Sequence, residues 1–226
     1  MVVSDYFDLS EFRYKDLFDG VEIVWEALGR IKEYMKAYKD YRVEGEVSPH
    51  AWFEGNDIAI GEGTIVEPGV MVHGPALIGK NCVLRQGAYL RGNVIAGDGA
   101  IIGHTTEVKN SIFLNGAHAA HFAYVGDSIL GKNVNLGAGT KLANFKFDTG
   151  ERTVKLNTGK GVESTGLRKM GAIIGDNSEL GCNSVTFPGT LVGPRTVAYP
   201  CSLLRGIIPG DSIVKNRPVL DIAPRK

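Results

Sequence analysis

The strongest regularity in the chain is an apolar residue at every sixth position. Counted from residue 60, this series holds over the following members: Ile60, Val66, Val72, Ile78, Leu84, Leu90, Ala96, Ile102, Val108, Leu114 and Ala120. Neither the helical period of about 3.6 residues nor the strand period of 2 produces such spacing. A chain that turns a corner every six residues does produce it, so the pattern predicts a parallel β-helix of hexapeptide repeats.

The six-residue frame then slips between Ala120 and Tyr124, a segment that contains His121. Two further series follow: Tyr124, Leu130, Leu136, Leu142, and then Ile174, Leu180, Thr186, Val192, Ala198, Leu204. Residues 145–170 are polar, charged and off-period, which predicts a loop that projects from the stack. We therefore expect a β-helix over 46–210 and a C-terminal tail over 211–226.

Residues 1–45 follow a different pattern, typical of a short helical segment. The stretches 10–18 and 21–38 look helical, and one face of the second carries the following side chains: Trp25, Leu28, Ile31 and Met35. We expect this segment to cap the open N-terminal coil or to pack against a partner subunit. Structural packing is the favoured role.

Three sides of six residues make a triangular coil, so residues 18 apart stack at a spacing of about 4.8 Å. One corner column places Arg91 and Lys109 one coil apart. Two stacked cations repel each other unless an anion bridges them or solvent screens them. A phosphate between them would receive charge-assisted hydrogen bonds. Two solvated surface charges are the simpler alternative, which the spacing alone favours.

His121 is the candidate for acid–base chemistry. It falls at the frame slip, and a break in a regular pattern is where function tends to lie. Histidine is the usual general base near neutral pH, whereas a turn histidine bonded to backbone is the alternative. No metal site is predicted, because His118 and His121 are not on a helix and no nearby cysteine or carboxylate completes a ligand set.

Composition narrows the functional classes. Twenty-five basic residues balance 25 acidic ones, which gives no support to nucleic-acid binding. Cys82, Cys182 and Cys201 lack metal-ligand spacing and indicate free thiols in a reducing compartment. The sequence shows neither a signal-peptide pattern nor an apolar run of membrane-spanning length, so we expect a cytoplasmic protein.

Two segments resemble a known family. The stretch 107–144, EVKNSIFLNGAHAAHFAYVGDSILGKNVNLGAGTKLAN, resembles the acetyltransferase half of bifunctional N-acetylglucosamine-1-phosphate uridyltransferases. The stretch 165–193 resembles archaeal-type sugar-1-phosphate nucleotidylyltransferases that carry a C-terminal acetyltransferase domain. This resemblance implies a left-handed β-helix, a homotrimer, and acetyl-CoA as co-substrate. The implied reaction is N-acetylation of glucosamine 1-phosphate or galactosamine 1-phosphate.

Position by position, the resemblance assigns the general base to His121. It assigns substrate binding to Arg91, Lys109, Tyr124 and Asn135, and acetyl-CoA binding to Ala138 and Asn144. Backbone N–H groups in 137–139 are then expected to hold the oxyanion. Because His121 and Arg91 occupy different corners, up to about 20 Å apart, we expect sites assembled between neighbouring subunits.

The chain also departs from the family. It shows no pyrophosphorylase half and no Gly-rich nucleotide loop, so uridylyl transfer is not predicted. The family's loop lysine has three candidates here, namely Lys146, Arg152 and Lys155. Two alternatives remain open: a different hexapeptide acyltransferase that uses an acyl carrier protein or acts on a nucleotide-linked sugar, and a non-catalytic scaffold or regulatory subunit.

Overall fold

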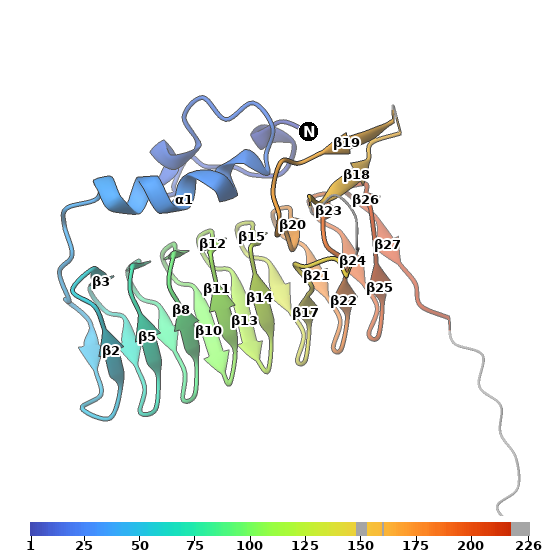
Figure 1. The fold of residues 1–226 in the computed structure, drawn as a ribbon. Helices are drawn as coiled ribbons and strands as arrows, with labels where there is room; N and C mark the ends of the chain where they lie inside the picture. The colour runs from blue at the N-terminus through green and yellow to red at the C-terminus, as the bar shows by residue number, and fades with distance from the viewer. Residues whose placement is uncertain (148–152, 160, 218–226) are drawn as a thin grey trace, which may run out of the picture.

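The computed structural model describes residues 1–147, 153–159 and 161–217. Its main body is a triangular stack of short parallel strands that form three sheets, here named A, B and C (Figure 1). Sheet A contains β3 Ile58–Ile60, β6 Ala76–Ile78, β9 Val94–Ala96, β12 Ser111–Phe113, β15 Ile129–Leu130, β20 Ala172–Ile174, β23 Thr190–Val192 and β26 Ile207–Ile208.

Sheet B contains β1 Glu46–Val47, β4 Ile65–Val66, β7 Val83–Leu84, β10 Ile101–His104, β13 His118–His121, β16 Asn135–Leu136, β21 Glu179–Leu180, β24 Val197–Ala198 and β27 Ile213–Val214. Sheet C contains β2 Trp52–Glu54, β5 Met71–His73, β8 Tyr89–Arg91, β11 Glu107–Lys109, β14 Tyr124–Gly126, β17 Lys141–Leu142, β22 Val185–Thr186 and β25 Leu203–Leu204.

Each coil passes from sheet A to B to C and then returns to A one strand further along the stack. The predicted left-handed parallel β-helix is confirmed. One aliphatic side chain per strand points inward and forms a continuous core along the axis. β27 pairs with β24, so sheet B extends past residue 210, where the sequence had placed the end of the β-helix.

The frame slip lies elsewhere than the sequence predicted. Ile102 pairs with Ala119 and Val108 with Val125, which are 17 rather than 18 residues apart. Phe113, Ala119 and Val125 therefore point inward instead of Leu114, Ala120 and Tyr124. His121 does not lie at the slip.

Two corners that are each one residue short cause this change of spacing. They are centred on Asn110 and Asp127, whose backbones have positive φ angles of 45° and 48°. Both corners join sheet C to sheet A. Asparagine and aspartate tolerate this left-handed conformation better than most residues. The apolar series continued through the first deletion because Leu114 is buried on the outside of the stack and Ala120 is small and apolar.

The N-terminal segment covers the outer face of sheet A along the axis of the stack (Figure 1). It contains two 3₁₀ turns, η1 Val3–Asp5 and η2 Lys15–Phe18, and one helix, α1 Glu26–Ala37. It therefore packs on its own β-helix rather than capping the first coil. The expected helix over 10–18 is reduced to η2. The helix expected from residue 21 begins five residues later, after the stretch 21–25, which is rich in β-branched residues that disfavour helix.

Sheet A is apolar on its outer side, which explains this cover. Its outward residues are Ala59, Leu77, Ile95, Ile112, Ile129, Ile173 and Leu191, all of them buried. Phe7, Phe12 and Ile31 of the N-terminal segment belong to the same apolar cluster. Asp176 anchors the segment, because its carboxylate accepts a 2.7 Å hydrogen bond from the Asp8 backbone N–H. Burial raises the pKa of Asp176.

The excursion predicted over 145–170 leaves the stack between β17 and β20. Its base is closed by the Met170 N–H, which donates to the Asn144 carbonyl at 3.0 Å. Its described part contains an antiparallel hairpin, β18 Lys155–Asn157 and β19 Val162–Ser164. Residues 148–152 and 160, like 218–226 of the tail, lie outside the described residues. Among the described residues, the single α-helix lacks the length and apolarity needed to cross a bilayer.

We predict that Ile31→Ala lowers the free energy of unfolding by about 2–5 kcal/mol, since it opens a cavity between α1 and sheet A. Ile31 is 0% exposed. Urea denaturation followed by circular dichroism measures the change. The matched control is Ile65→Ala on sheet B, where the side chain is 46% exposed and the expected loss is small. Equal losses in the two variants would contradict the packing role of the N-terminal segment.

Candidate active site

His121 ends strand β13, at the edge where sheet B turns into sheet C. Its side chain is exposed, and its imidazole makes no hydrogen bond to another described residue. Its backbone carbonyl accepts a 3.0 Å hydrogen bond from Gly139 N–H of the next coil, which fixes the position of the backbone. The backbone of His121 is thus fixed, and its imidazole is exposed and free to contact a ligand.

The residue stacked directly below His121 is His104, not the Gly103 expected from an 18-residue coil. His104 Nδ1 lies 2.9 Å from the carbonyl oxygen of Gln86, and its ring meets Phe122 edge-on at 5.1 Å. The alternative of a turn histidine bonded to backbone therefore describes His104. Of these two stacked imidazoles, only that of His121 is left available to a ligand.

Arg91 and Lys109 stack at the opposite edge of sheet C, as predicted, because Leu90 pairs with Val108. Arg91 Nη1 forms a 2.6 Å ion pair with Glu107 Oε1, which raises the pKa of Arg91. Lys109 makes no ion pair with another described residue. Glu107 was missed by the sequence analysis, although it stands one coil above Tyr89 on the same face and two residues before Lys109. An anion at this edge would compete with Glu107 for Arg91.

Tyr124 lies on sheet C between these two edges, one coil above Glu107. Burial raises its pKa, while the adjacent Asn144 amide lowers it. A Cβ atom added to Gly126 would lie 2.6 Å from Asn144 Nδ2 and 2.7 Å from the Tyr124 hydroxyl. The glycine therefore permits the two side chains to converge on the same point.

A buried network holds Asn144 in place. Asn144 Nδ2 donates to Asp127 Oδ2 at 2.5 Å, and Asn110 Nδ2 donates to Asp127 Oδ1 at 2.9 Å. Asp127 and Asn144 are 7% and 8% exposed. The Asn144 side chain is thus committed within the protein, so its geometry favours positioning Tyr124 over binding a ligand directly. Asp127 was not among the predicted residues, because an 18-residue coil does not stack it on Asn110, which lies 17 residues before it.

Asn135 and Ala138 lie on either side of the edge that carries His121. Asn135 is exposed on sheet B and pairs with His118, not with His121. Ala138 follows β16 on the coil above His121. The predicted oxyanion role is wrong for two of the three nearby N–H groups, since Gly137 donates to Leu180 and Gly139 to His121. The Ala138 N–H has no partner among the described residues.

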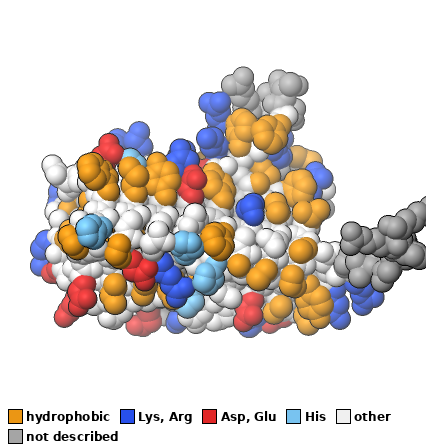
Figure 2. Space-filling model, turned by 90° about the horizontal axis from the view of Figure 1, so that it is seen from below, with side chains coloured by type: hydrophobic (Ala, Val, Ile, Leu, Met, Phe, Trp, Pro, Cys, Tyr) orange, Lys and Arg blue, Asp and Glu red, His pale blue; other side chains and the backbone are white. Residues whose placement is uncertain are grey.

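The predicted residues therefore divide among four places in one chain. His121 and Ala138 mark one edge of sheet C and Tyr124 lies on the sheet itself. Arg91, Lys109 and Asn144 mark the other edge, and Asn135 lies on sheet B. Figure 2, which views the side opposite the N-terminal segment, shows histidines and hydrophobic side chains exposed on this open surface. Within the described residues, no group of three or more His, Cys, Asp or Glu side chains is placed to hold a metal ion.

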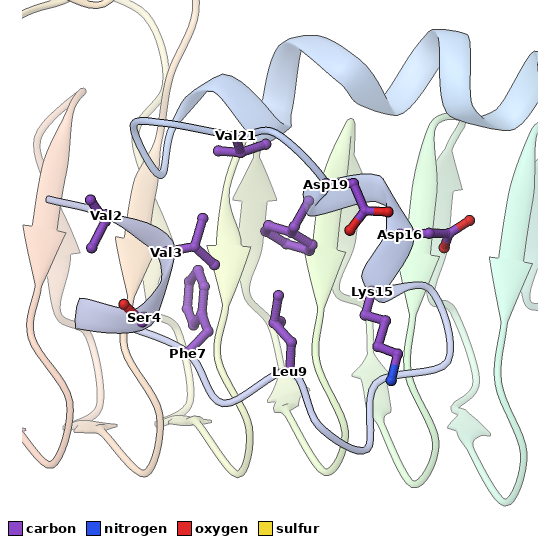
Figure 3. Close-up of a pocket in the computed structure, with 10 residues that line it drawn as sticks. Val2, Val3, Ser4, Phe7, Leu9, Lys15, Asp16, Asp19 and Val21 are labelled. Carbon is purple, nitrogen blue, oxygen red and sulfur yellow. The ribbon is translucent and has the colours of Figure 1, made fainter.

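A cavity of about 570 Å³ lies within the N-terminal segment, away from all these residues (Figure 3). Phe7 and three valines give it apolar walls, and Lys15, Asp16 and Asp19 stand on one side. A second cavity, of about 490 Å³, lies at the base of the excursion beside Ala143 and Val185. Neither cavity is lined by His121.

Similar proteins indicate the family to which this chain belongs. A family model described as the GMPPB C-terminal domain matches residues 72–179. The bifunctional protein GlmU of Methanococcus vannielii is 30% identical over 214 residues, which cover 91% of this chain and 51% of that protein. A bifunctional sugar-1-phosphate nucleotidylyltransferase/acetyltransferase of Sulfurisphaera tokodaii is 38% identical over 154 residues, covering 60% of this chain and 38% of that protein.

The chain is a relative of the bifunctional GlmU proteins. This finding confirms the resemblance inferred from the sequence, although the chain spans only about half the length of these relatives, or less. Among solved structures, an Arabidopsis UDP-N-acetylglucosamine acyltransferase matches with a TM-score of 0.45 and 16% identity, over 76% of this chain and 70% of that one. At that level, the match says nothing about the substrate of this chain.

We predict that Asp127→Asn lowers the free energy of unfolding by about 1–3 kcal/mol, because one of the two amides loses its buried acceptor. Urea denaturation measures the loss. Asp211→Asn is the matched control, since that carboxylate is 66% exposed in its pair with Arg195 and a surface ion pair contributes little to stability. A loss at position 127 no larger than the control would show that the network does not stabilise the shortened corners.

Proposed function

We propose that this chain is an acetyl-CoA-dependent N-acetyltransferase that acts on an amino-sugar 1-phosphate, glucosamine or galactosamine 1-phosphate. The observation that carries the proposal is the contrast between the two stacked histidines. His104 is bound to backbone, whereas His121 presents a free imidazole three residues before Tyr124 on the same coil, with the open Ala138 N–H on the next coil. The relationship to proteins named as acetyltransferases supports the same reaction class.

His121 is assigned the role of general base. The amino group of the sugar attacks the thioester carbonyl, and the imidazole takes the proton that the nitrogen loses as the new C–N bond forms. The Ala138 N–H is placed on the same edge to donate to the developing oxyanion. When the tetrahedral intermediate collapses, the C–S bond breaks. The proton on His121 then passes to the departing thiolate, which restores the neutral base.

Arg91 and Lys109 are assigned to the phosphate of the substrate. Lys109 is available, and Arg91 exchanges Glu107 for the phosphate or shares its guanidinium between the two anions. Holding the phosphate fixes the position of the amine and lowers the entropic cost of reaching the transition state. Tyr124, held by Asn144 and Asp127, gives the sugar a rigid surface between the two edges.

The two edges are too far apart to act on one substrate within a chain. β14 spans from one edge to the other, so their separation is of the order of 15 Å. We propose that the active form is a homotrimer in which His121 of one copy faces Arg91 and Lys109 of the next. Sheets B and C are available for such contacts, because only sheet A is covered by the N-terminal segment.

The first test is the release of CoA thiol from acetyl-CoA with each of the two amino-sugar phosphates. We expect wild type and His104→Ala to turn over and His121→Ala to lose at least about a hundredfold in kcat. The reverse pattern would move the base to His104. No turnover of either sugar by a folded wild-type protein would instead favour the alternatives, a nucleotide-linked acceptor, an acyl-carrier donor or a scaffold.

A complementation experiment tests the shared site. His121→Ala and Lys109→Ala are each expected to be weakly active alone. Mixed trimers from their co-expression should recover about a quarter of wild-type activity, since a quarter of the interfaces then combine an intact base with an intact lysine. Mixing His121→Ala with Ala138→Pro is the control, because both changes lie on the same edge and no interface in the mixture then has that edge intact. Absence of recovery in the first mixture would place the whole site within one chain.

A further inference from the structure

Phe122 directly follows the proposed base His121 and has an unusual backbone conformation. Its φ angle is 50°, in the left-handed region that glycine, asparagine and aspartate tolerate best. Among the described residues with this conformation, Phe122 is the only aromatic one, whereas Asn133 and Asn183 are typical. A bulky side chain is strained there, and such strain is typical of functional sites. Folding alone therefore gives no reason for a phenylalanine at this corner.

The Phe122 ring is also left open to the surroundings. The residue is 55% exposed, so its side chain gains little from the core of the β-helix. The coil above brings Ala138 and Gly139 to this edge, where the Gly139 N–H donates to the His121 carbonyl. Neither of these two residues has a side chain beyond a methyl group to cover the ring. The aromatic surface beside the proposed base thus remains accessible to a ligand.

Contacts with the coil below hold the ring in place. The Phe122 N–H donates to the His104 carbonyl at 2.9 Å, and the two rings meet edge-on with centroids 5.1 Å apart. The His104 imidazole is itself fixed, since its Nδ1 lies 2.9 Å from the Gln86 carbonyl oxygen. These contacts give the backbone-bound histidine a role: it supports an aromatic ring and is not a second base.

The level of Phe122 in the stack places it with the acceptor rather than the donor. Lys109 lies on the coil of His104, one coil below Phe122, and Arg91 lies one coil lower still. The Ala138 N–H, assigned to the oxyanion, lies one coil above. The two edges meet in the proposed trimer by rotation about an axis along the stack, and this rotation keeps each coil at its level. The ring therefore lies at a level between the proposed phosphate site and the reacting amine.

We propose that Phe122 binds the ring of the acceptor sugar and is a specificity-determining residue for a pyranose. This inference rests on the proposed function. A pyranose carries hydroxyl groups around its rim and C–H bonds on its faces. The face of an aromatic ring is electronegative and attracts these C–H bonds, so the two rings stack. With the phosphate held by Arg91 and Lys109, the second contact orients the 2-amino group toward His121. His104 is then a positioning residue that acts through Phe122.

The main test compares Phe122→Asn with wild type by calorimetric titration of the full chain with glucosamine 1-phosphate and, separately, galactosamine 1-phosphate. We expect the Kd and the KM of the sugar phosphate to rise about five- to tenfold, because the stacking contact is lost. The kcat and the KM for acetyl-CoA should not change, the pattern of lost ground-state binding of the acceptor. Since asparagine suits the left-handed backbone, the Tm should not fall.

Two variants serve as matched controls. Phe122→Tyr keeps the aromatic face, so its Kd and KM for the sugar phosphate should stay within about twofold of wild type. Thr105→Asn makes a comparable change at the equivalent corner one coil below, where φ is 51°, and should leave both constants unaltered.

Two further measurements separate ring stacking from phosphate binding. The inhibition constant of inorganic phosphate against the sugar phosphate should be unaltered in Phe122→Asn and raised in Lys109→Ala, since phosphate alone has no ring to stack. His104→Ala should keep its kcat but raise the KM for the sugar about threefold, because the supporting contact with Phe122 is lost.

The outcomes distinguish this inference from the proposed function. Acetylation by Phe122→Asn with an unaltered Kd and KM for the sugar would overturn the role of Phe122 and leave the proposed function standing. A raised KM for acetyl-CoA, dissociation of the oligomer, or a fall in Tm of more than about 4 °C would each overturn it too, by assigning the ring to the donor, to a contact between copies, or to stability. Variant-sensitive binding of the sugar phosphate without acetylation would support Phe122 and overturn the proposed function. Absence of sugar binding and of acetylation in wild type would overturn both.

Discussion

The hydrogen-bonded register between successive coils is the constraint on which the rest of this structure depends. Every strand of sheets A, B and C must meet the strand of the coil before it, or the backbone groups of the whole stack lose their partners. A residue can therefore be added or removed only at a corner. Both shortened corners, at Asn110 and Asp127, and the long excursion after Asn144 occur at the same one, between sheets C and A. All irregularity is collected at one edge, and the sheets remain continuous.

This constraint also explains how the candidate site is built. Because the coil spacing is fixed, a side chain's position is determined by its place in the register, and its chemistry by its local partners. His104 and His121 occupy the same register position on adjacent coils, yet one is bound to Gln86 and the other is free. Similarly, Arg91 and Lys109 stack as expected, but Glu107 reaches only Arg91. The site arises from small differences between equivalent positions.

The sequence predicted the repeat well because one inward aliphatic residue per strand is what the core requires. It misplaced the slip because a deletion of one residue leaves an apolar series intact when a neighbour is also apolar for another reason. Leu114 is apolar since it is buried under the N-terminal segment, and this made it look like a core residue. The six-residue pattern identifies only the side chains that point into the core of the β-helix. It does not show which outward side chains are covered by another segment.

The position of the N-terminal segment was predictable in principle. The outward residues of sheet A, among them Ile95, Ile112 and Ile129, are as apolar as the inward ones, which a solvent-exposed sheet would not tolerate. Sheets B and C lack such a complete apolar row. The contacts of Asp127 were not predictable from the six-residue frame, because the partners 17 residues apart become visible only once the slip is placed correctly. Single-residue register errors thus hide side-chain networks even when the fold is right.

The network around Asp127 links the two halves of the proposed site. The Asn144 side chain donates to Asp127 and faces Tyr124, while its backbone carbonyl accepts the Met170 N–H that closes the excursion. One residue thus contacts Tyr124 and fixes the base of the segment that carries Phe145 and Phe147.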